Sequence, residues 1–375
     1  MYTFGGKGTG TSQWGLMVGS VFERILSDLE REVEAVEGVG AAGTAVGADD
    51  AASELRAAAA DMRRLSESRM RKWLSMIFPY GSEFPWDSTG HEEIHTWLLR
   101  AGKHAAANKT VGAVLAYMAL LPHWAYSGSA RRYWDYVING KTSIGNEREF
   151  HHYGSTLNAV AVLDSYRAYP LRGHLLRLGT AALLGHLSNI YPSGAASMAW
   201  HGDPALLRRD GYSGDYGIGL YGYWRSAAAY LDCIAERGWE CMLCDIVHPP
   251  AVAAAERMAC TSRVVIAPRD ALCRRAYLAP LGLMVSVEGA RIAEVAYEPN
   301  EQAVDVSLQR HEAAPSAEAT LFLVVERVYP PPLEGGWLVT CPEVPSCSRK
   351  GLRDAHVIKL VSDGRTRVRL KSMRP

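Results

Sequence analysis

Residues 151–167 read HHYGSTLNAVAVLDSYR, two histidines and a tyrosine followed by a largely apolar stretch. Tyr153, Leu157 and Val160 recur at the spacing of one helix face, which predicts a helix over 152–168. The polar residues come where this helix starts, so the stretch also predicts a polar cluster at the N-terminal end of the helix. Adjacent His and Tyr side chains are suited to proton transfer and to hydrogen bonding with hydroxyl groups.

Similar helical periodicity recurs on both sides of this stretch. The predicted helices cover 14–36, 54–76, 91–104, 108–121, 171–188 and 218–236, with a small-residue loop at 38–52. Loops rich in Gly, aromatic and polar residues cover 122–141, 188–204 and 209–219. Helical hairpins with long loops predict an α/α toroid over residues 1–250, with fewer helices than a closed (α/α)6 barrel. Loops on such a scaffold are where functional sites usually form.

The pattern changes from helical to alternating near residue 250. Val304, Val306 and Leu308 alternate with polar residues, as in a half-buried strand. Further strands are predicted at 319–328, 336–340, 356–361 and 366–371. Short strands separated by turn residues favour a β-sandwich over 255–375. The sequence therefore predicts an α+β chain of two domains, a helical toroid followed by a β-sandwich.

Composition narrows the partners before any site is considered. The 375 residues include 40 Lys and Arg against 40 Asp and Glu, so no bulk charge favours nucleic acid or an anionic membrane. No apolar run is long enough to span a bilayer, and the first residues lack the pattern of a secretory signal. We therefore expect neither nucleic acid nor a membrane as partner, expect no cofactor, and leave localisation open.

The seven cysteines cannot all pair with one another within the chain, and their spacing matches no regular disulfide framework. Disulfide status is therefore open. Cys241-x-x-Cys244 has no second pair at zinc spacing, so it is a weak indication of a metal site. We interpret it as two core cysteines at a helix end.

The segment YGSEFPWDSTGHEEIH, residues 80–95, contains the His-Glu-x-x-His pattern of zinc peptidases at His91 and His95. Two features argue against zinc. Glu93 places a charge where the zinc-binding helix normally has a packed, uncharged residue, and Gly90 puts His91 in the first helical turn. We therefore predict no metal site.

The same segment supports two other interpretations. Thr89 and Glu92 have the spacing of a capping box, which would do no more than start a helix. Alternatively, the segment forms part of an acidic cleft that cleaves sugars, because glycoside hydrolysis requires two carboxyl groups on either side of the scissile bond. Glu83 lies beside an aromatic ring in sequence, and Asp87 follows Trp86, so desolvation would raise the pKa of either carboxyl group.

Further carboxylates occur in later loops. Asp215 lies in YSGDYG and Asp203 in HGDP. We predict Asp87 and Asp215 as the general acid and the base or nucleophile, with Glu83 as a substitute for either. A separation of about 5 Å would favour retention of configuration, whereas about 6.5–9.5 Å leaves room for a water molecule and favours inversion.

Other residues would hold the sugar. Trp and Tyr rings offer a flat apolar face for stacking, and polar side chains hydrogen-bond to hydroxyl groups. The predicted stacking residues are Trp86, Trp124, Tyr126, Trp134 and Tyr216. The predicted polar contacts are His151, His152, Tyr153, His201 and Asp203.

Four stretches resemble the DUF5695 family, which is regarded as related to six-hairpin glycosidases with an (α/α)6 toroid. They are YGSEFPWDSTGHEE (80–93), LLPHWAYSGSARRYWDYVINGK (120–141), HHYGSTLNAVAVLDSYR (151–167), and YPSGAASMAWHGDP through DGYSGDYGIGLYGYW (191–224). The resemblance implies a carbohydrate-active toroid with β-sandwich neighbours. Relatives tend to be longer, with a sandwich domain before the toroid and a secretion signal, so secretion is implied if this chain is an N-terminally shortened form.

Two other functions fit the same fold. A polysaccharide lyase would use His152, Tyr153, Arg148 and Asn158 to remove a proton beside a uronate carboxylate. The acidic loops argue against it, because a uronate requires a basic cleft. A degenerate relative would bind glycans without cleaving them. Glycoside hydrolysis of an oligo- or polysaccharide is the function that we predict.

Overall fold

The computed structural model describes the chain in segments and divides it into two compact units. The described residues are 25–26, 29, 33, 48–74, 91–117, 150–169, 173–184, 192–193, 199–200, 222–224, 226–234, 236–247, 260–310, 320–327, 337–340, 347–349, 355–359 and 365–372. One unit comprises 1–166 and 172–226, and the other comprises 167–171 and 227–375. Within the described part of the chain, no helix combines the length and the apolarity needed to cross a bilayer.

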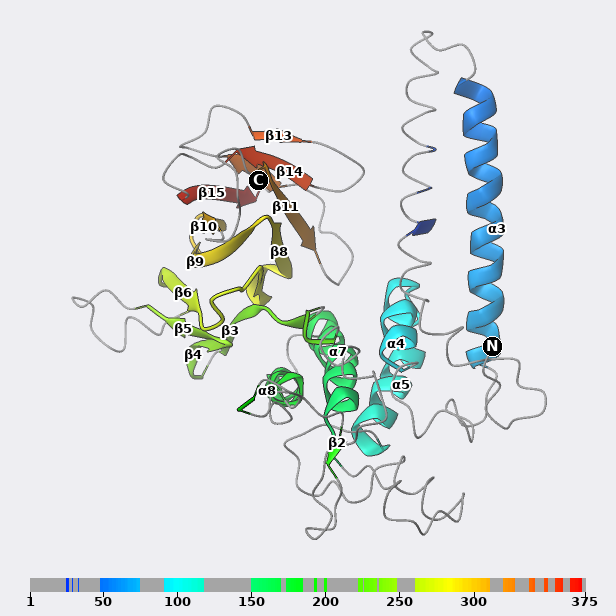
Figure 1. The fold of residues 1–375 in the computed structure, drawn as a ribbon, viewed down its shortest axis with the longest axis horizontal. Coiled ribbons are helices and arrows are strands. Elements are labelled where there is room, and N and C mark those ends of the chain that lie inside the picture. The colour runs from blue at the N-terminus through cyan, green and yellow to red at the C-terminus, as the bar shows by residue number, and fades with distance from the viewer. Residues whose placement is uncertain are drawn as a thin grey trace. The chain divides into compact units, whose positions relative to one another are not determined.

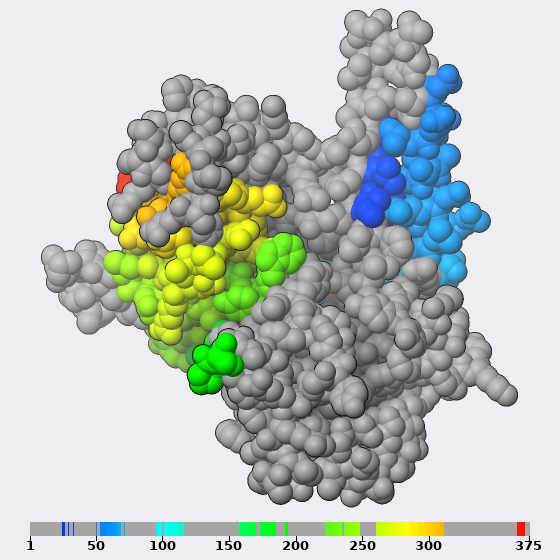
Figure 2. All heavy atoms as spheres, in the orientation of Figure 1, coloured from blue at the N-terminus to red at the C-terminus, as the bar shows by residue number. Residues whose placement is uncertain are grey.

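The longest helix of the first unit is α3, Ala48–Leu74 (Figure 1). It begins inside the stretch 38–52 that we predicted as a loop. Its sequence is rich in Ala and Arg, which are strong helix formers, and this propensity extends the helix into the predicted loop. Ala59 and Ser66 are buried, but most of its described side chains are exposed, and Figure 2 shows its atoms (blue) along the surface.

Two consecutive helices follow, α4 (His91–Arg100) and α5 (His104–Tyr117). Gly102 ends α4 in the left-handed conformation, with φ of 68°. The N–H of Lys103 then donates back to the carbonyl of Leu98 at 2.8 Å, the closing bond of a Schellman motif. The predicted helices over 91–104 and 108–121 are confirmed, with ends shifted by a few residues.

The helix α7 spans His152–Ala168, the bounds that periodicity predicts. Every residue from Asn158 to Ala168 is buried, so this part of α7 is enclosed on all sides. The next helix, α8 (Gly173–Leu183), approaches α7 closely at one point. A Cβ added at Gly179 would lie 2.7 Å from Cγ of Leu163, so a glycine is needed there.

The second unit contains two sheets in which neighbouring strands are often not consecutive in the chain. The bounds of their later strands confirm the strands predicted after residue 319. The seven-stranded sheet has the order β13 (Cys347–Arg349), β14 (Ala355–Lys359), β11 (Thr320–Arg327), β8 (Leu283–Glu288), β7 (Arg275–Leu278), β3 (Ala229–Ile234) and β4 (Gly238–Met242). The six-stranded sheet has the order β12 (Trp337–Thr340), β15 (Arg365–Ser372), β10 (Ala303–Arg310), β9 (Ala290–Glu298), β6 (Val264–Pro268) and β5 (Cys244–Ile246). Neighbouring strands are antiparallel except β3 and β7, which are parallel.

One hydrophobic core serves both sheets. It includes Leu231 and Val285 from the seven-stranded sheet and Ile266, Val306 and Val368 from the six-stranded sheet. The alternation of Val304, Val306 and Leu308 noted in the sequence corresponds to the buried face of β10. A single core lined by two sheets is the arrangement of sheets packed face to face.

The second unit also includes the last residues of α7. Arg167 is buried and donates through Nη1 to the hydroxyl of Tyr230 at 3.5 Å. The hydroxyl of Tyr277 donates to the carbonyl of Arg167 at 3.2 Å. The rings of Tyr230 and Tyr277 meet edge to face with centroids 5.9 Å apart, so each tyrosine combines aromatic packing with a satisfied hydroxyl group.

The predicted helix over 218–236 is wrong for Ala229–Ile234, which forms β3. The first four residues of β3 are all buried, so the strand reads as a continuous apolar run. Periodicity cannot separate such a run from a buried helix. The β-strands of the second unit thus begin before residue 250, where we had expected the helical part to end.

Candidate functional site

The residues predicted to act on the substrate mostly lie outside the described part of the chain. This holds for the carboxylates Glu83, Asp87 and Asp215. It also holds for Trp86, Trp124, Tyr126, Trp134, His201, Asp203 and Tyr216. For His151, His152 and Tyr153 the structure describes the backbone alone. What it does define is how several segments that carry these residues are anchored.

Two of these segments pair directly through their backbones. Strand β1 (Phe150–His151) is antiparallel to β2 (Ala199–Trp200), with Phe150 opposite Trp200 and His151 opposite Ala199. Opposite residues in such a ladder have Cα atoms about 4.5–5.5 Å apart. The histidine pair at the start of α7 therefore lies beside a segment whose next residue in the sequence is His201.

A third segment is anchored on the same part of α7. Gly222 follows the predicted loop that carries Asp215, and it is buried. A Cβ added at Gly222 would lie 2.8 Å from the carbonyl oxygen of Thr156, so the two backbones touch and only glycine fits. Thr156 is about one helical turn beyond His152. The start of α7 and the strand directly before it thus contact backbones from two later segments that were predicted to belong to one site.

A buried polar contact connects α4 with α7. Oγ1 of Thr96 donates to Oδ2 of Asp164, and both residues are almost completely buried. A buried carboxylate is costly unless it is hydrogen-bonded, and this bond supplies one partner. Asp164 therefore has a structural role, although it is a carboxylate in the helix nearest to the predicted site.

His95 is enclosed in the same helical unit. Its Nδ1 lies 3.0 Å from the carbonyl oxygen of Ala107, so Nδ1 carries the proton and donates. Burial lowers the pKa of His95 to about 4, and the nearby Asp164 carboxylate offsets only part of this shift. The imidazole is therefore neutral at pH 7, with Nε2 buried as an acceptor that has no hydrogen-bond partner among the described residues.

The zinc interpretation of His91 and His95 depends on a residue whose side chain is not described. The side chain of His91 lies outside the described residues, whereas that of His95 is oriented by Ala107. A backbone carbonyl on the second ring nitrogen is also common among metal-binding histidines. Within the described ranges, no three His, Cys, Asp or Glu residues gather in a way that could hold a metal ion.

Asn158, a member of the lyase alternative, is completely buried within α7. An asparagine that neutralises a uronate carboxylate must reach the polymer. Complete burial is the environment of a structural residue, which weakens the lyase interpretation. The arginine of that alternative, Arg148, lies outside the described residues.

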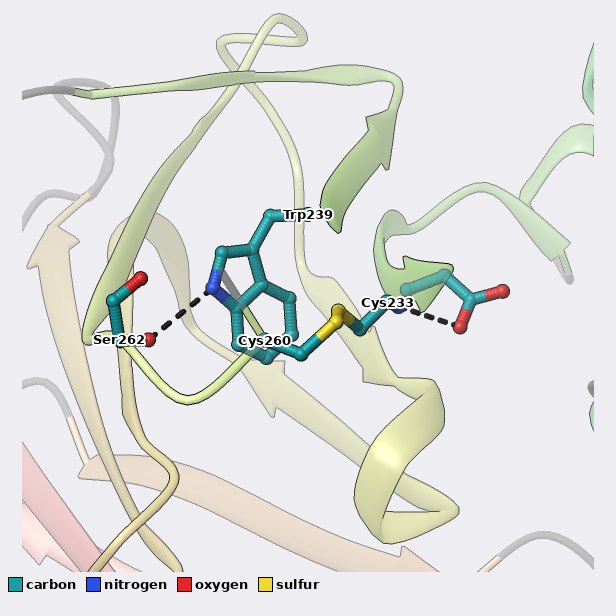
Figure 3. Close-up of a disulfide and its surroundings, with 5 residues drawn as sticks. Cys233, Trp239, Cys260 and Ser262 are labelled. Carbon is teal, nitrogen blue, oxygen red and sulfur yellow. Dashed lines mark hydrogen bonds between the residues drawn. A yellow bond between two sulfur atoms is a disulfide. The ribbon is translucent and has the colours of Figure 1, made fainter. Parts of the chain in front are cut away.

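The second unit contains a disulfide that the sequence analysis left open. Cys233 on β3 is bonded to Cys260, 27 positions later (Figure 3). Beside it, Nε1 of Trp239 donates to the carbonyl of Ser262 at 3.2 Å. The disulfide thus lies next to a buried tryptophan whose indole N–H is itself hydrogen-bonded.

The interpretation of Cys241 and Cys244 as cysteines at a helix end is wrong. Cys241 lies on β4 and Cys244 begins β5, so the pair spans the turn between two strands. No signal in the sequence separated these possibilities, because the neighbouring apolar residues fit a strand or a buried helix equally well.

Comparison with known protein families finds one match. A family model described as "Family of unknown function (DUF5695)" matches residues 3–329. The chain belongs to the DUF5695 family. No curated protein and no solved structure matches it.

The DUF5695 match extends well beyond the four stretches that carried the resemblance. It ends just after β11, so it includes the helical unit and the strands from β3 to β11. The DUF5695 region therefore includes α7, at whose start three predicted site residues lie, and much of the two-sheet core. The description of the family assigns no activity.

Proposed function

We propose that this DUF5695 protein is a glycoside hydrolase that cleaves an oligo- or polysaccharide with a pair of carboxyl groups. The helical unit would be an α/α toroid, and the two sheets would be its β-sandwich neighbour. One observation carries the proposal. The β1–β2 ladder and the Gly222–Thr156 contact bring backbone segments near positions 150, 200 and 222 onto one end of α7.

The chemistry follows from the residues in and beside these segments. Asp215 lies seven positions before Gly222, His201 directly follows β2, and Asp203 lies two positions beyond His201. Asp87, preceded by Trp86, would complete the carboxyl pair, with Glu83 as the substitute. The aromatic residues of the loops, Trp124, Tyr126, Trp134 and Tyr216, would stack on sugar rings. His151, His152 and Tyr153 at the start of α7 would bind hydroxyl groups.

A screen of polysaccharides with reducing-end detection tests this proposal. On the substrate found, Asp87→Asn and Asp215→Asn are each expected to lower the rate about 100- to 10,000-fold, the usual contribution of a general acid or base. Asp50→Asn is the matched control, because Asp50 is an exposed carboxylate on α3. Full activity in both Asp87→Asn and Asp215→Asn would refute the assignment.

The same screen separates the two alternatives. A polysaccharide lyase leaves an unsaturated product that absorbs in the ultraviolet, whereas a hydrolase does not. A glycan-binding relative would gain thermal stability with sugar and release no product. Either outcome would replace hydrolysis as the proposed function.

A further inference from the structure

The turn between β4 and β5 brings two cysteines into contact. Leu243, the single residue between the strands, has φ of 60°, a left-handed conformation that is uncommon for a leucine. The N–H of Arg269 donates to the carbonyl of Leu243 at 3.0 Å and holds this turn in place. Across the turn, the thiol of Cys241 donates to the carbonyl oxygen of Cys244 at 2.9 Å.

The two thiols differ in accessibility. Cys241 is half-buried, so part of this residue is open to solvent. Cys244 is only 2% exposed, and its Sγ lies 3.5 Å from the carbonyl of Tyr230 and 3.3 Å from that of Met242. Of the two cysteines, Cys241 is therefore the one that a reagent in solution would meet first.

The pKa values of the two thiols are also shifted in opposite directions, downward for Cys241 and upward for Cys244. The neighbouring Cys244 thiol lowers the pKa of Cys241, and the nearby Arg269 guanidinium lowers it further, against the opposing effects of burial and Asp245. The neighbouring Cys241 thiol and burial both raise the pKa of Cys244. Of the two cysteines, the half-buried Cys241 is thus the one that ionises more readily, and the thiolate is the nucleophilic form of cysteine.

We propose that Cys241 and Cys244 form a thiol–disulfide exchange site whose substrate is a low-molecular-weight disulfide such as oxidised glutathione. The Cys241 thiolate attacks one sulfur of the substrate, the substrate S–S bond breaks, and one thiol leaves with a proton from water. Cys244 then loses its proton to water and attacks Sγ of Cys241, which expels the second thiol. The two protein thiols are oxidised to one disulfide, and the substrate is reduced to two thiols.

Two neighbouring features fit this assignment. The Cys233–Cys260 disulfide lies on the adjacent strand β3, so this unit already contains a cysteine pair in the oxidised form. Cys273, the third free cysteine among the described residues, is buried, and burial raises the pKa of its thiol. It is therefore expected to stay unreactive, which makes it a matched control within the same core.

The experiment uses the full chain with Cys241 and Cys244 reduced, treated with oxidised glutathione and mapped by peptide mass spectrometry. The wild type should form a Cys241–Cys244 disulfide, whereas Cys244→Ser should retain glutathione on Cys241. Cys241→Ser should form neither product, and Cys273→Ser should behave as the wild type. Absence of the glutathione adduct in a folded Cys244→Ser protein would overturn the proposal.

A second measurement needs no variant. Iodoacetamide should modify Cys241 of the wild type at pH 7 at least about tenfold faster than Cys273, because the rate follows the thiolate fraction and exposure. Peptide mapping separates both sites from Cys341 and Cys347. Equal rates at Cys241 and Cys273 would contradict the proposed asymmetry even if Cys244→Ser failed to fold.

Discussion

The hydroxyl of Thr96 on α4 donates a hydrogen bond to the carboxylate of Asp164 on α7, 68 positions later in the chain. Thr96→Val removes this donor and leaves a buried carboxylate with one partner fewer. We expect a loss of about 1–3 kcal/mol in the free energy of unfolding. Urea unfolding followed by the helical circular dichroism signal measures it.

Thr110→Val is the matched control for this change. Thr110 is buried as well, but its hydroxyl donates at 2.9 Å to the carbonyl of Ala106 in its own helix. That carbonyl already accepts the helical backbone bond, so the loss should be smaller. An equal loss in both variants would mean that the contact between α4 and α7 has no special weight.

The buried imidazole of His95 predicts a specific dependence of stability on pH. Its pKa falls from 6.5 in the unfolded chain to about 4 in the folded one, so between these values the unfolded state binds the additional proton. Stability should therefore rise with pH across this window and should be lost as the pH falls through it. The contribution of this group reaches about 3 kcal/mol at most.

His95→Met should remove this part of the pH dependence, and His104→Gln, at an exposed position on α5, should leave it unchanged. Unfolding free energies measured at several pH values between 4 and 7 provide the comparison. The prediction is wrong if the slope of His95→Met equals that of the wild type.

Gly222→Ala should strongly destabilise the helical unit, because the added methyl group would lie 2.8 Å from the Thr156 carbonyl oxygen and the backbone cannot yield cheaply. Gly112→Ala on α5 meets nothing within 4 Å and should stabilise the helix by about 0.5–1 kcal/mol. Thermal unfolding should therefore show a lower melting temperature for Gly222→Ala and a higher one for Gly112→Ala than for the wild type. Two shifts of the same sign would contradict the close contact of Gly222 with α7.

Loss of the Cys233–Cys260 disulfide should destabilise the two-sheet unit. Its loop of 27 residues corresponds to about 3–4 kcal/mol in the chain-entropy estimate. The double variant Cys233→Ser, Cys260→Ser should show this loss in guanidinium unfolding followed by tryptophan fluorescence, because Trp239 lies beside the bond. A stability unchanged from the wild type, in protein shown to contain the disulfide, would contradict the prediction.

The alternation of apolar and polar residues predicted strands that have one buried face and one partly exposed face. Strand β10 alternates between core and partly exposed positions, so its period of two was visible in the sequence. Helix α7 was predicted from the helical spacing of Tyr153, Leu157 and Val160. Strand β3 was missed because both of its faces are buried, and the start of α3 was missed because Gly and Ala near its beginning suggested a loop.

The candidate site was less accessible to sequence reasoning than the fold. Composition could suggest that His151 and the segment before His201 belong together, but only the ladder between β1 and β2 pairs their backbones. The partner of Cys233 could not be chosen among seven cysteines by spacing. Such pairings depend on contacts between residues far apart in the chain, which no local pattern encodes.

The strands before residue 250 determine where a fragment that contains the two sheets can begin. A fragment beginning at residue 255 would lack β3, β4 and β5, which would leave β7 and β6 as bare, apolar sheet edges open to aggregation. Starting at Ala227 restores those strands, but the hydroxyl of Tyr277 would still lack its acceptor on Arg167. Fragments for crystallisation should therefore retain α7, even when the sheets alone are the target.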